Sequence, residues 1–126
     1  MDEVLKRALS DYAVAAHAQS ARSVEGDAAR ANAHYEELRN ALLTISQYGE
    51  EGVEAMLTLL SSGSPDVKGW AATHLLSKKP REAVSALEEL ARGSGIIAFE
   101  ARMTLQEWRE NPSRFAANWP SVKRGQ

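Results

Sequence analysis

The chain has 126 residues, 44% of them hydrophobic and 25% charged, and it contains no cysteine. That length suits one domain with its own hydrophobic core, and the lack of cysteine excludes a disulfide scaffold and a thiolate metal site. Fifteen Lys and Arg residues oppose 17 Asp and Glu residues, and the formal net charge of −2 gives phosphate backbones no general attraction. The acidic start Met1-Asp2-Glu3 is unlike a secretory signal, and no apolar run is long enough to span a membrane. We therefore expect a cytoplasmic protein that does not enter a membrane.

Apolar residues recur at the i, i+3, i+4 spacing of a helix face in the segments between the glycines and prolines. No segment alternates apolar and polar residues as a half-buried strand does. We predict an all-α domain over residues 1–126 with about six helices. A helical hairpin would occupy 1–49, two stacked helix pairs 50–112 and a C-terminal tail 113–126.

In chain order, the helices are expected over residues 2–22, 27–45, 50–62, 65–75, 80–91 and 96–108. Asp27 suits the N-cap of the second helix, and Ser64-Pro65-Asp66 supplies an N-cap, a first-turn proline and a first-turn acid for the fourth. Gly69 lies inside the predicted helix 65–75, where it costs about 1 kcal/mol relative to Ala.

The second half of the chain contains a weak internal repeat. Residues 53–56 align with residues 84–87, 31 positions later, and the partner helices align similarly, with Val67, Ala71 and Leu75 matching Ile97, Ala101 and Leu105. Neither helix pair can bury its apolar stripe alone, so we expect the two pairs to stack.

Residues 59–72, LLSSGSPDVKGWAA, resemble the turn of a HEAT-like repeat: a leucine pair, small polar residues, Pro-Asp-Val and a basic residue, then paired alanines. Lys68 stands where arginine is commoner, and the second copy lacks the Pro-Asp pair. Over nearly the whole chain, the motifs at 32–35, 68–76 and 105–108 are also similar to bacterial proteins of the domain-of-unknown-function family two-thousand-nineteen. That resemblance implies a HEAT-like α-α superhelix and brings no established activity.

Two histidines fall at matching heights in the predicted hairpin. If the chain turns near residues 25–26, His17 and His34 lie side by side, and Asp11 or Glu37 could complete a metal site. No His-x-x-x-His or Glu-x-x-His spacing supplies a third ligand. We therefore favour two partly exposed histidines and expect no metal or other cofactor.

Asn32 and Asn40 share a face of the second predicted helix, and Arg39 lies beside it. Asn is a poor residue inside a helix because its amide competes for backbone hydrogen bonds. Each amide therefore needs a partner, either the backbone of a neighbouring turn or a ligand. The family resemblance implies an Asn at position 32, and we take Asn32 and Arg39 as candidate partner-binding residues.

Trp70 and His74 lie one turn apart on the fourth predicted helix. In stacked helix pairs, the second helices line the concave face, where a Trp is a natural hot spot for binding a protein. The structural alternative is that Trp70 fills space between the repeats near Ala101. We take Trp70 and His74 as candidate partner-binding residues beside that alternative.

No catalytic motif is found in the sequence. Adjacent residues point about 100° apart on a helix, so none of the acidic pairs at 36–37, 50–51 and 88–89 converges on one substrate atom. No phosphate-binding loop or nucleophile elbow occurs. In the tail, Phe115 and Trp119 are expected to fold back and cap the exposed end of the helix stack. The alternative is a docking segment steered by Arg114, Lys123 and Arg124.

These observations favour a non-catalytic helical-repeat module that binds another protein through its concave or N-terminal surface. One alternative is a nucleic-acid binder or a DNA-glycosylase-like protein. Residues 50–112 carry seven Lys or Arg against ten Asp or Glu, which argues against nucleic acid unless a basic groove forms around Lys68, Arg102 and Arg109. Another alternative is a small-molecule site between the hairpin and the repeats, near Asn32, Tyr35 and Trp70. The sequence does not set the oligomeric state.

Overall fold

A computed structural model describes residues 2–24 and 28–120, leaving aside the side chains of 19–24, 28 and 31. The described residues contain helices and no strand, which confirms the predicted all-α class. In chain order the elements are α1 (Glu3–Val24), α2 (Ala28–Ser46), α3 (Glu50–Leu57), the 3-10 helix η1 (Thr58–Ser61), α4 (Pro65–Leu75), α5 (Pro80–Ala91), α6 (Gly95–Glu110) and the 3-10 helix η2 (Pro112–Asn118). Asp27, predicted as an N-cap, and the tail residues Lys123 and Arg124 lie outside the described residues.

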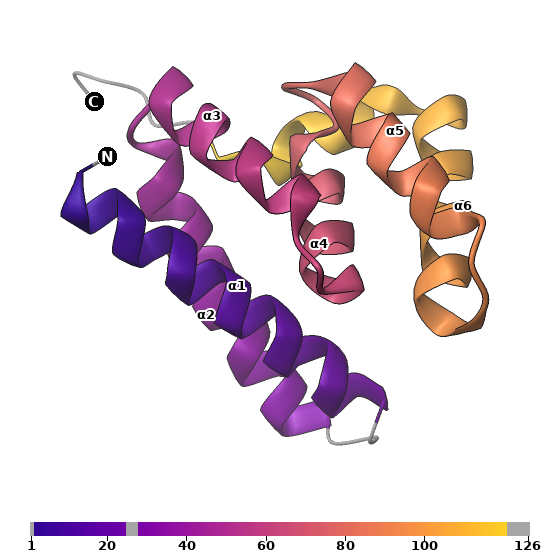
Figure 1. The fold of residues 1–126 in the computed structure, drawn as a ribbon, viewed down its shortest axis with the longest axis horizontal. Helices are drawn as coiled ribbons and strands as arrows, with labels where there is room; N and C mark the ends of the chain where they lie inside the picture. The colour runs from indigo at the N-terminus through magenta and orange to yellow at the C-terminus, as the bar shows by residue number, and fades with distance from the viewer. Residues whose placement is uncertain (1, 25–27, 121–126) are drawn as a thin grey trace.

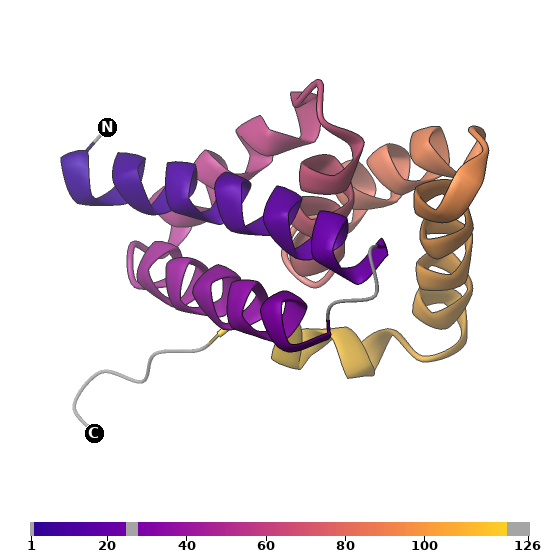
Figure 2. The ribbon, with the colours of Figure 1, turned by 90° about the horizontal axis from the view of Figure 1, so that it is seen from below.

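α1 and α2 form a hairpin and lie side by side along their length (Figures 1 and 2). Asp2 caps α1 by accepting from the backbone N–H of Val4 at 2.7 Å, and its carboxylate also accepts from the Tyr48 hydroxyl at 3.1 Å. The loop after α2 is thereby tied to the start of α1. Each helix buries one apolar stripe, which comprises Leu5, Ala8, Tyr12, Ala15 and Ala16 in α1 and Leu38, Ala41, Leu42 and Ile45 in α2.

A tight turn leads from α2 into α3. Gly49 takes a φ of +59°, in the left-handed region that favours glycine. α3 ends earlier than the predicted residue 62. After Leu57 the chain tightens into η1, where the Thr58 hydroxyl donates to the Ala55 carbonyl at 2.6 Å. The leucines 59 and 60 therefore stand on a 3-10 turn rather than on a last α-helical turn.

α4, α5 and α6 pack in succession, each helix against the next (Figure 1). Small and branched side chains fill the contacts: Val67, Ala71, Ala72 and Leu75 in α4, Ala83, Ala86 and Leu87 in α5, and Ala98, Ala101 and Leu105 in α6. The buried Lys68 of α4 also reaches Glu89 of α5, with Nζ and Oε1 2.7 Å apart. Apolar packing and one ion pair together join α4 to α5.

The described part of the tail, residues 113–120, folds back onto the helix stack. Phe115 and Trp119 are buried, and Phe115 meets Trp108 edge-on with ring centroids 5.8 Å apart. η2 contacts α6 and α4 and runs back beneath the molecule toward the hairpin (Figure 2). The expected burial of both aromatic side chains is confirmed, and η2 packs against α6 and α4.

Buried apolar side chains from α1 through α6, together with Phe115 and Trp119, join in one continuous core. The helices of the hairpin thus share their core with the helix stack. Within residues 2–24 and 28–120, no helix is both long and apolar enough to cross a bilayer.

Two glycines inside helices, Gly52 in α3 and Gly69 in α4, predict opposite effects of alanine. At Gly69, inside α4, an added Cβ would lie 3.6 Å from Leu90 Cδ1, an ordinary contact. Gly69→Ala should therefore raise the free energy of unfolding by about 0.5–1 kcal/mol through its helix propensity, as measured by urea unfolding.

Gly52→Ala is the matched contrast. Its Cβ would collide with the Ile45 carbonyl oxygen, so α3 would have to move off α2. We expect a loss of roughly 1–3 kcal/mol in the same assay. A destabilised Gly69→Ala or a neutral Gly52→Ala would contradict this packing.

Candidate interaction surface

The predicted site residues Trp70 and His74 lie in a cluster that joins α4 to the hairpin. Trp70 packs against Tyr35 of α2, with ring centroids 5.8 Å apart, and against His74 at 5.7 Å. His74 meets Tyr12 of α1 edge-on at 5.7 Å, and the Tyr12 hydroxyl oxygen and His74 Nδ1 share a hydrogen bond of 2.6 Å. We call Tyr12, Tyr35, Trp70 and His74 the aromatic joint. Because its members come from α1, α2 and α4, the joint fixes how the helix stack sits on the hairpin.

Burial sets the charge state of the joint. It lowers the pKa of His74 from 6.5 to about 4, and the positive charge of Arg39 adds to the effect. Burial also raises the pKa of Tyr12 well above its usual value of 10. Tyr12 therefore keeps its proton and His74 stays neutral, so their hydrogen bond joins two uncharged groups.

The joint limits what Trp70 and His74 can contact outside the molecule. His74 is only 6% exposed, and its ring is in contact with Tyr12 of the hairpin, so little of it can reach a partner. Trp70 is half-buried. Trp70 fills space as in the structural alternative, but against Tyr35 of the hairpin rather than between the repeats beside Ala101. Two of the three residues predicted to border a small-molecule site, Tyr35 and Trp70, are thus in ring contact with each other.

The other two predicted site residues, Asn32 and Arg39, lie on α2 and are exposed. Asn32 lies one turn before Tyr35, and Arg39 lies one turn after it, close enough to act on the charge of His74. The structure thus gathers Arg39, Trp70 and His74 around one junction, with Asn32 at its margin.

The two histidines weighed as metal ligands contact separate carboxylates. His17 Nδ1 lies 2.7 Å from Asp66 Oδ2 and so links α1 to the start of α4, whereas His34 Nδ1 lies 3.4 Å from Glu37 Oε1 within α2. Partial burial acts to raise the pKa of Asp66, but hydrogen bonds from Ser64, His17 and the backbone outweigh it and hold that pKa below its usual value. Among the side chains that the structure describes, no three His, Asp or Glu residues gather as metal ligands would.

The Ser, Asp and His side chains at the start of α4 do not form a nucleophile. The Ser64 hydroxyl donates to Asp66, and the imidazole of His17 contacts the other oxygen of the same carboxylate. In a catalytic triad the histidine must accept the serine proton, with the acid behind it. Here the acid stands between the two, so neither the acid nor the histidine activates the serine.

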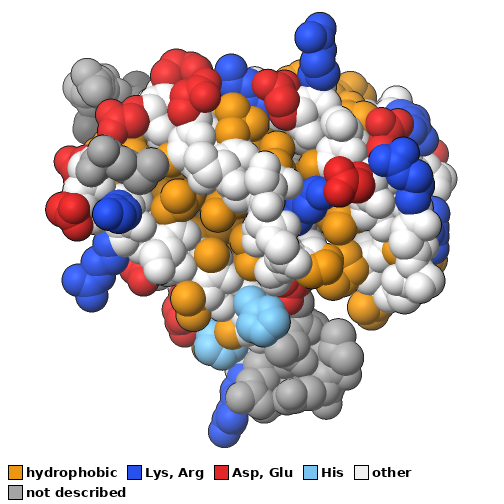
Figure 3. Space-filling view, in the orientation of Figure 1, with side chains coloured by type: hydrophobic (Ala, Val, Ile, Leu, Met, Phe, Trp, Pro, Cys, Tyr) orange, Lys and Arg blue, Asp and Glu red, His pale blue; other side chains and the backbone are white. Residues whose placement is uncertain are grey.

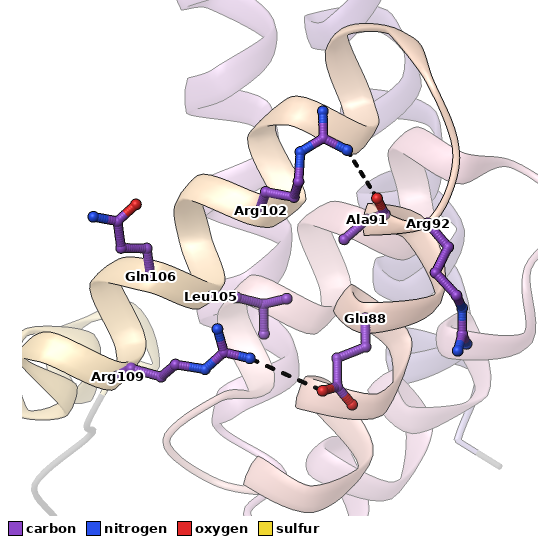
Figure 4. Close-up of a pocket in the computed structure, with 7 residues that line it drawn as sticks. All are labelled: Glu88, Ala91, Arg92, Arg102, Leu105, Gln106 and Arg109. Carbon is purple, nitrogen blue, oxygen red and sulfur yellow. Dashed lines mark hydrogen bonds and ion pairs between the residues drawn. The ribbon is translucent and has the colours of Figure 1, made fainter.

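A shallow groove of about 540 Å³ runs between α5 and α6 (Figure 4). Arg102 and Arg109 reach over it from α6, on either side of Leu105. The Arg102 guanidinium donates to the Ala91 carbonyl at 2.8 Å, and that of Arg109 lies 4.0 Å from Glu88. Each arginine is held at one contact and keeps its other N–H groups for further partners.

The groove is net positive, since Arg92, Arg102 and Arg109 oppose the single Glu88. Lys68, the third residue of the hypothesised basic groove, lies elsewhere and is buried against Glu89. On the face seen in Figure 3, basic and acidic side chains alternate around the rim, and hydrophobic side chains lie along the middle. The net positive charge therefore belongs to the lining of the α5–α6 groove, whereas the rim seen in Figure 3 carries both signs.

Beside this groove, the outward face of α6 carries three large exposed hydrophobic side chains. Ile96 is 58%, Phe99 56% and Met103 42% exposed, and their i, i+3, i+7 spacing places them in one line. We call these three residues the α6 stripe. The last helix of a stack usually turns a polar face to water. The α6 stripe is apolar instead, and η2 does not cover it. Packing within the fold therefore gives no reason for these three side chains.

The α6 stripe was not predicted from the sequence. The prediction for α6 was the apolar line of Ile97, Ala101, Leu105 and Trp108. The last three pack on the core, and Ile97 is half-buried. The overlooked signal was a second apolar line at helical spacing on the opposite side of the same helix. A globular surface helix needs only one such line.

Comparison with protein-family models, with curated proteins and with solved structures finds no match for this chain.

The aromatic joint predicts a particular dependence of stability on pH. The pKa of His74 is lower in the folded chain (about 4) than the ordinary value of 6.5, so the unfolded chain binds a proton first as the pH falls. His74 contributes its full stability above pH 6.5 and loses it between pH 6.5 and about 4, a loss of roughly 3 kcal/mol.

His74→Gln keeps an acceptor for the Tyr12 hydroxyl but cannot titrate. We expect its free energy of unfolding, measured by urea titration at several pH values, to vary less than that of the wild type over this window. His34→Gln serves as the control and should keep the wild-type slope. Equal slopes for the wild type and His74→Gln would contradict a neutral, buried His74.

Proposed function

We propose that this chain is a non-catalytic, HEAT-like helical module that binds another protein through the outward face of α6. The observation that carries the proposal is the α6 stripe, three large apolar side chains in one line that remain exposed beside the other described elements. Exposed apolar surface of this kind marks interaction sites. An amphipathic helix of a partner would meet it through residues at the same spacing.

The packing of the second half supports the HEAT-like part of the proposal. α3 contacts α4, α4 contacts α5, and α5 contacts α6, as consecutive helices of a solenoid do. The aligned inward lines of α4 and α6 both face the core, with Val67, Ala71, Leu75, Ala101 and Leu105 buried. Membership of the bacterial family two-thousand-nineteen, and a cytoplasmic location, stay predictions of the sequence.

The proposal moves the docking surface away from the concave or N-terminal surface expected from the sequence. His74 is buried in the aromatic joint and Trp70 is half-buried there, so both use their rings on the hairpin. Asn32 and Arg39 are exposed on α2, but no exposed aromatic side chain accompanies them among the described residues. The α6 stripe has the apolar anchors that energetic hot spots need.

Nucleic acid is a second candidate, because the α5–α6 groove is net positive. Three arginines, one of them 4.0 Å from Glu88, could neutralise few phosphates. Binding of labelled single-stranded or duplex DNA, followed by fluorescence anisotropy at low and moderate salt, tests it. We expect no saturable binding, and salt-sensitive binding lost in Arg102→Ala would instead favour this candidate.

A pair of matched substitutions tests the docking surface. Phe99→Asp charges the stripe, and Val14→Asp charges an equally accessible apolar residue on α1, which is 67% exposed. In the native cell, we expect cross-linking to join the wild type and Val14→Asp to the same partner. That partner can be a different protein or a second copy of this chain. The yield for Phe99→Asp should fall at least tenfold, since a buried charge without a partner costs several kcal/mol.

Circular dichroism should show the same helix content in all three proteins, because both substituted side chains are exposed. Equal cross-linking of Phe99→Asp and the wild type, or no cross-linked protein in any of them, would refute the α6 surface.

A further inference from the structure

The first half of the solvent-facing side of α6 has the residue pattern of a two-stranded coiled coil. The α6 stripe occupies core positions of a seven-residue repeat, with Ile96 and Met103 at position a and Phe99 at position d. The next core positions are polar, Gln106 at d and Glu110 at a, so the apolar seam spans residues 96–103. The flanking positions carry opposite charges: Glu100 and Glu107 at e, and Arg102 and Arg109 at g. The core and flanking positions named here are all exposed. The inward line of the same helix packs on the chain's own core, so the seam is the part of α6 left for a partner.

The charges on the two flanks select one orientation of a paired helix. In a parallel pair, the g residue of one helix faces the e residue five positions later on the other. Arg102 would then face Glu107 of the other copy, and the contact would occur twice about a two-fold axis. In an antiparallel pair, like flanks meet, arginine against arginine and glutamate against glutamate. A parallel pair is therefore attractive where an antiparallel pair is repulsive.

We infer that the partner of the α6 surface is a second copy of this chain, paired with α6 parallel to α6 about a two-fold axis. This inference rests on the proposed function, because it names the occupant of the same surface. The argument for a second copy is charge self-complementarity: one helix carries both the acidic flank and the basic flank that a parallel partner needs. Two-fold pairs are also the commonest closed assemblies.

The charged groups of the seam are placed to take up these contacts. Arg102 uses one N–H on the Ala91 carbonyl and keeps the rest of its guanidinium for another acceptor. Glu107 has a side chain 48% exposed and holds a 4.0 Å contact with Arg114. α6 has 16 residues, about 24 Å of helix, so the seam is short and the dimer should dissociate on dilution.

Sedimentation equilibrium of the full chain over about 1 µM to 1 mM tests the association. We expect a concentration-dependent dimer for the wild type and for Val14→Asp, and a monomer for Phe99→Asp. A wild type that is monomeric throughout this range would overturn the inference. If Phe99→Asp nevertheless lost a cross-linked partner in the cell, the proposed function would stand with a different protein as its partner.

Charge exchange tests the orientation. Arg102→Glu and Glu107→Arg alone should each weaken the dimer roughly tenfold, since two contacts change from attraction to repulsion. An equimolar mixture of the two variants should recover the wild-type dissociation constant, because each of the two contacts then again sets a glutamate of one copy against an arginine of the other. A tighter dimer for Arg102→Glu alone would indicate antiparallel helices and would overturn the parallel pairing.

A single introduced cysteine gives an independent measurement, because the natural chain has none. In a parallel pair, residue 96 of one copy lies opposite residue 96 of the other, so Ile96→Cys should form a disulfide-linked dimer under mild oxidation. Val14→Cys, equally exposed on α1, is the control and should stay largely monomeric. Equal rates of dimer formation for the two variants would count against the parallel seam.

Discussion

The hydrogen bond between the Tyr12 hydroxyl and the buried His74 imidazole fixes the arrangement on which the rest of the molecule depends. The Tyr12 hydroxyl oxygen and His74 Nδ1 are 2.6 Å apart, and this bond holds α4 against the hairpin. The rings of Tyr35 and Trp70 pack against each other beside it. α5 follows α4, and α6 follows α5, so the direction in which α6 faces the solvent is set by how α4 sits on α1 and α2. Such a bond is strong in a dry site and costly when one partner is lost.

The two ends of the molecule are therefore built differently. At the hairpin end, aromatic side chains use their apolar surface to hold α4, α1 and α2 together. At the other end, α6 exposes a line of apolar side chains, and η2, which could have covered them, runs under α4 instead. This uncovered apolar line, flanked by opposite charges, is the observation on which the proposed interaction surface rests.

The predictions from the sequence were correct where a local pattern of residues is compatible with a single structure. The inward lines of α2, α4 and α6, Pro65 and Pro80 at helix starts, and the burial of Phe115 and Trp119 follow from helical spacing and apolar area. The direction of the tail and the partner of Trp70 depend on which helices become neighbours, which no local pattern encodes. The spacing of Ile96, Phe99 and Met103 indicates a second apolar line on α6. Only the fold shows which of the two apolar lines of α6 is exposed to solvent.

The most direct test of the central claim is an NMR titration that follows backbone amide shifts as the protein concentration rises. We predict shift changes confined to residues 96–110 and the groove residues of α5, with α1 and α2 unchanged. Shift changes centred on Asn32 and Arg39 of α2 would contradict the proposal that α6 carries the docking surface. No shift changes anywhere up to about 1 mM would contradict the pairing of α6 with a second copy.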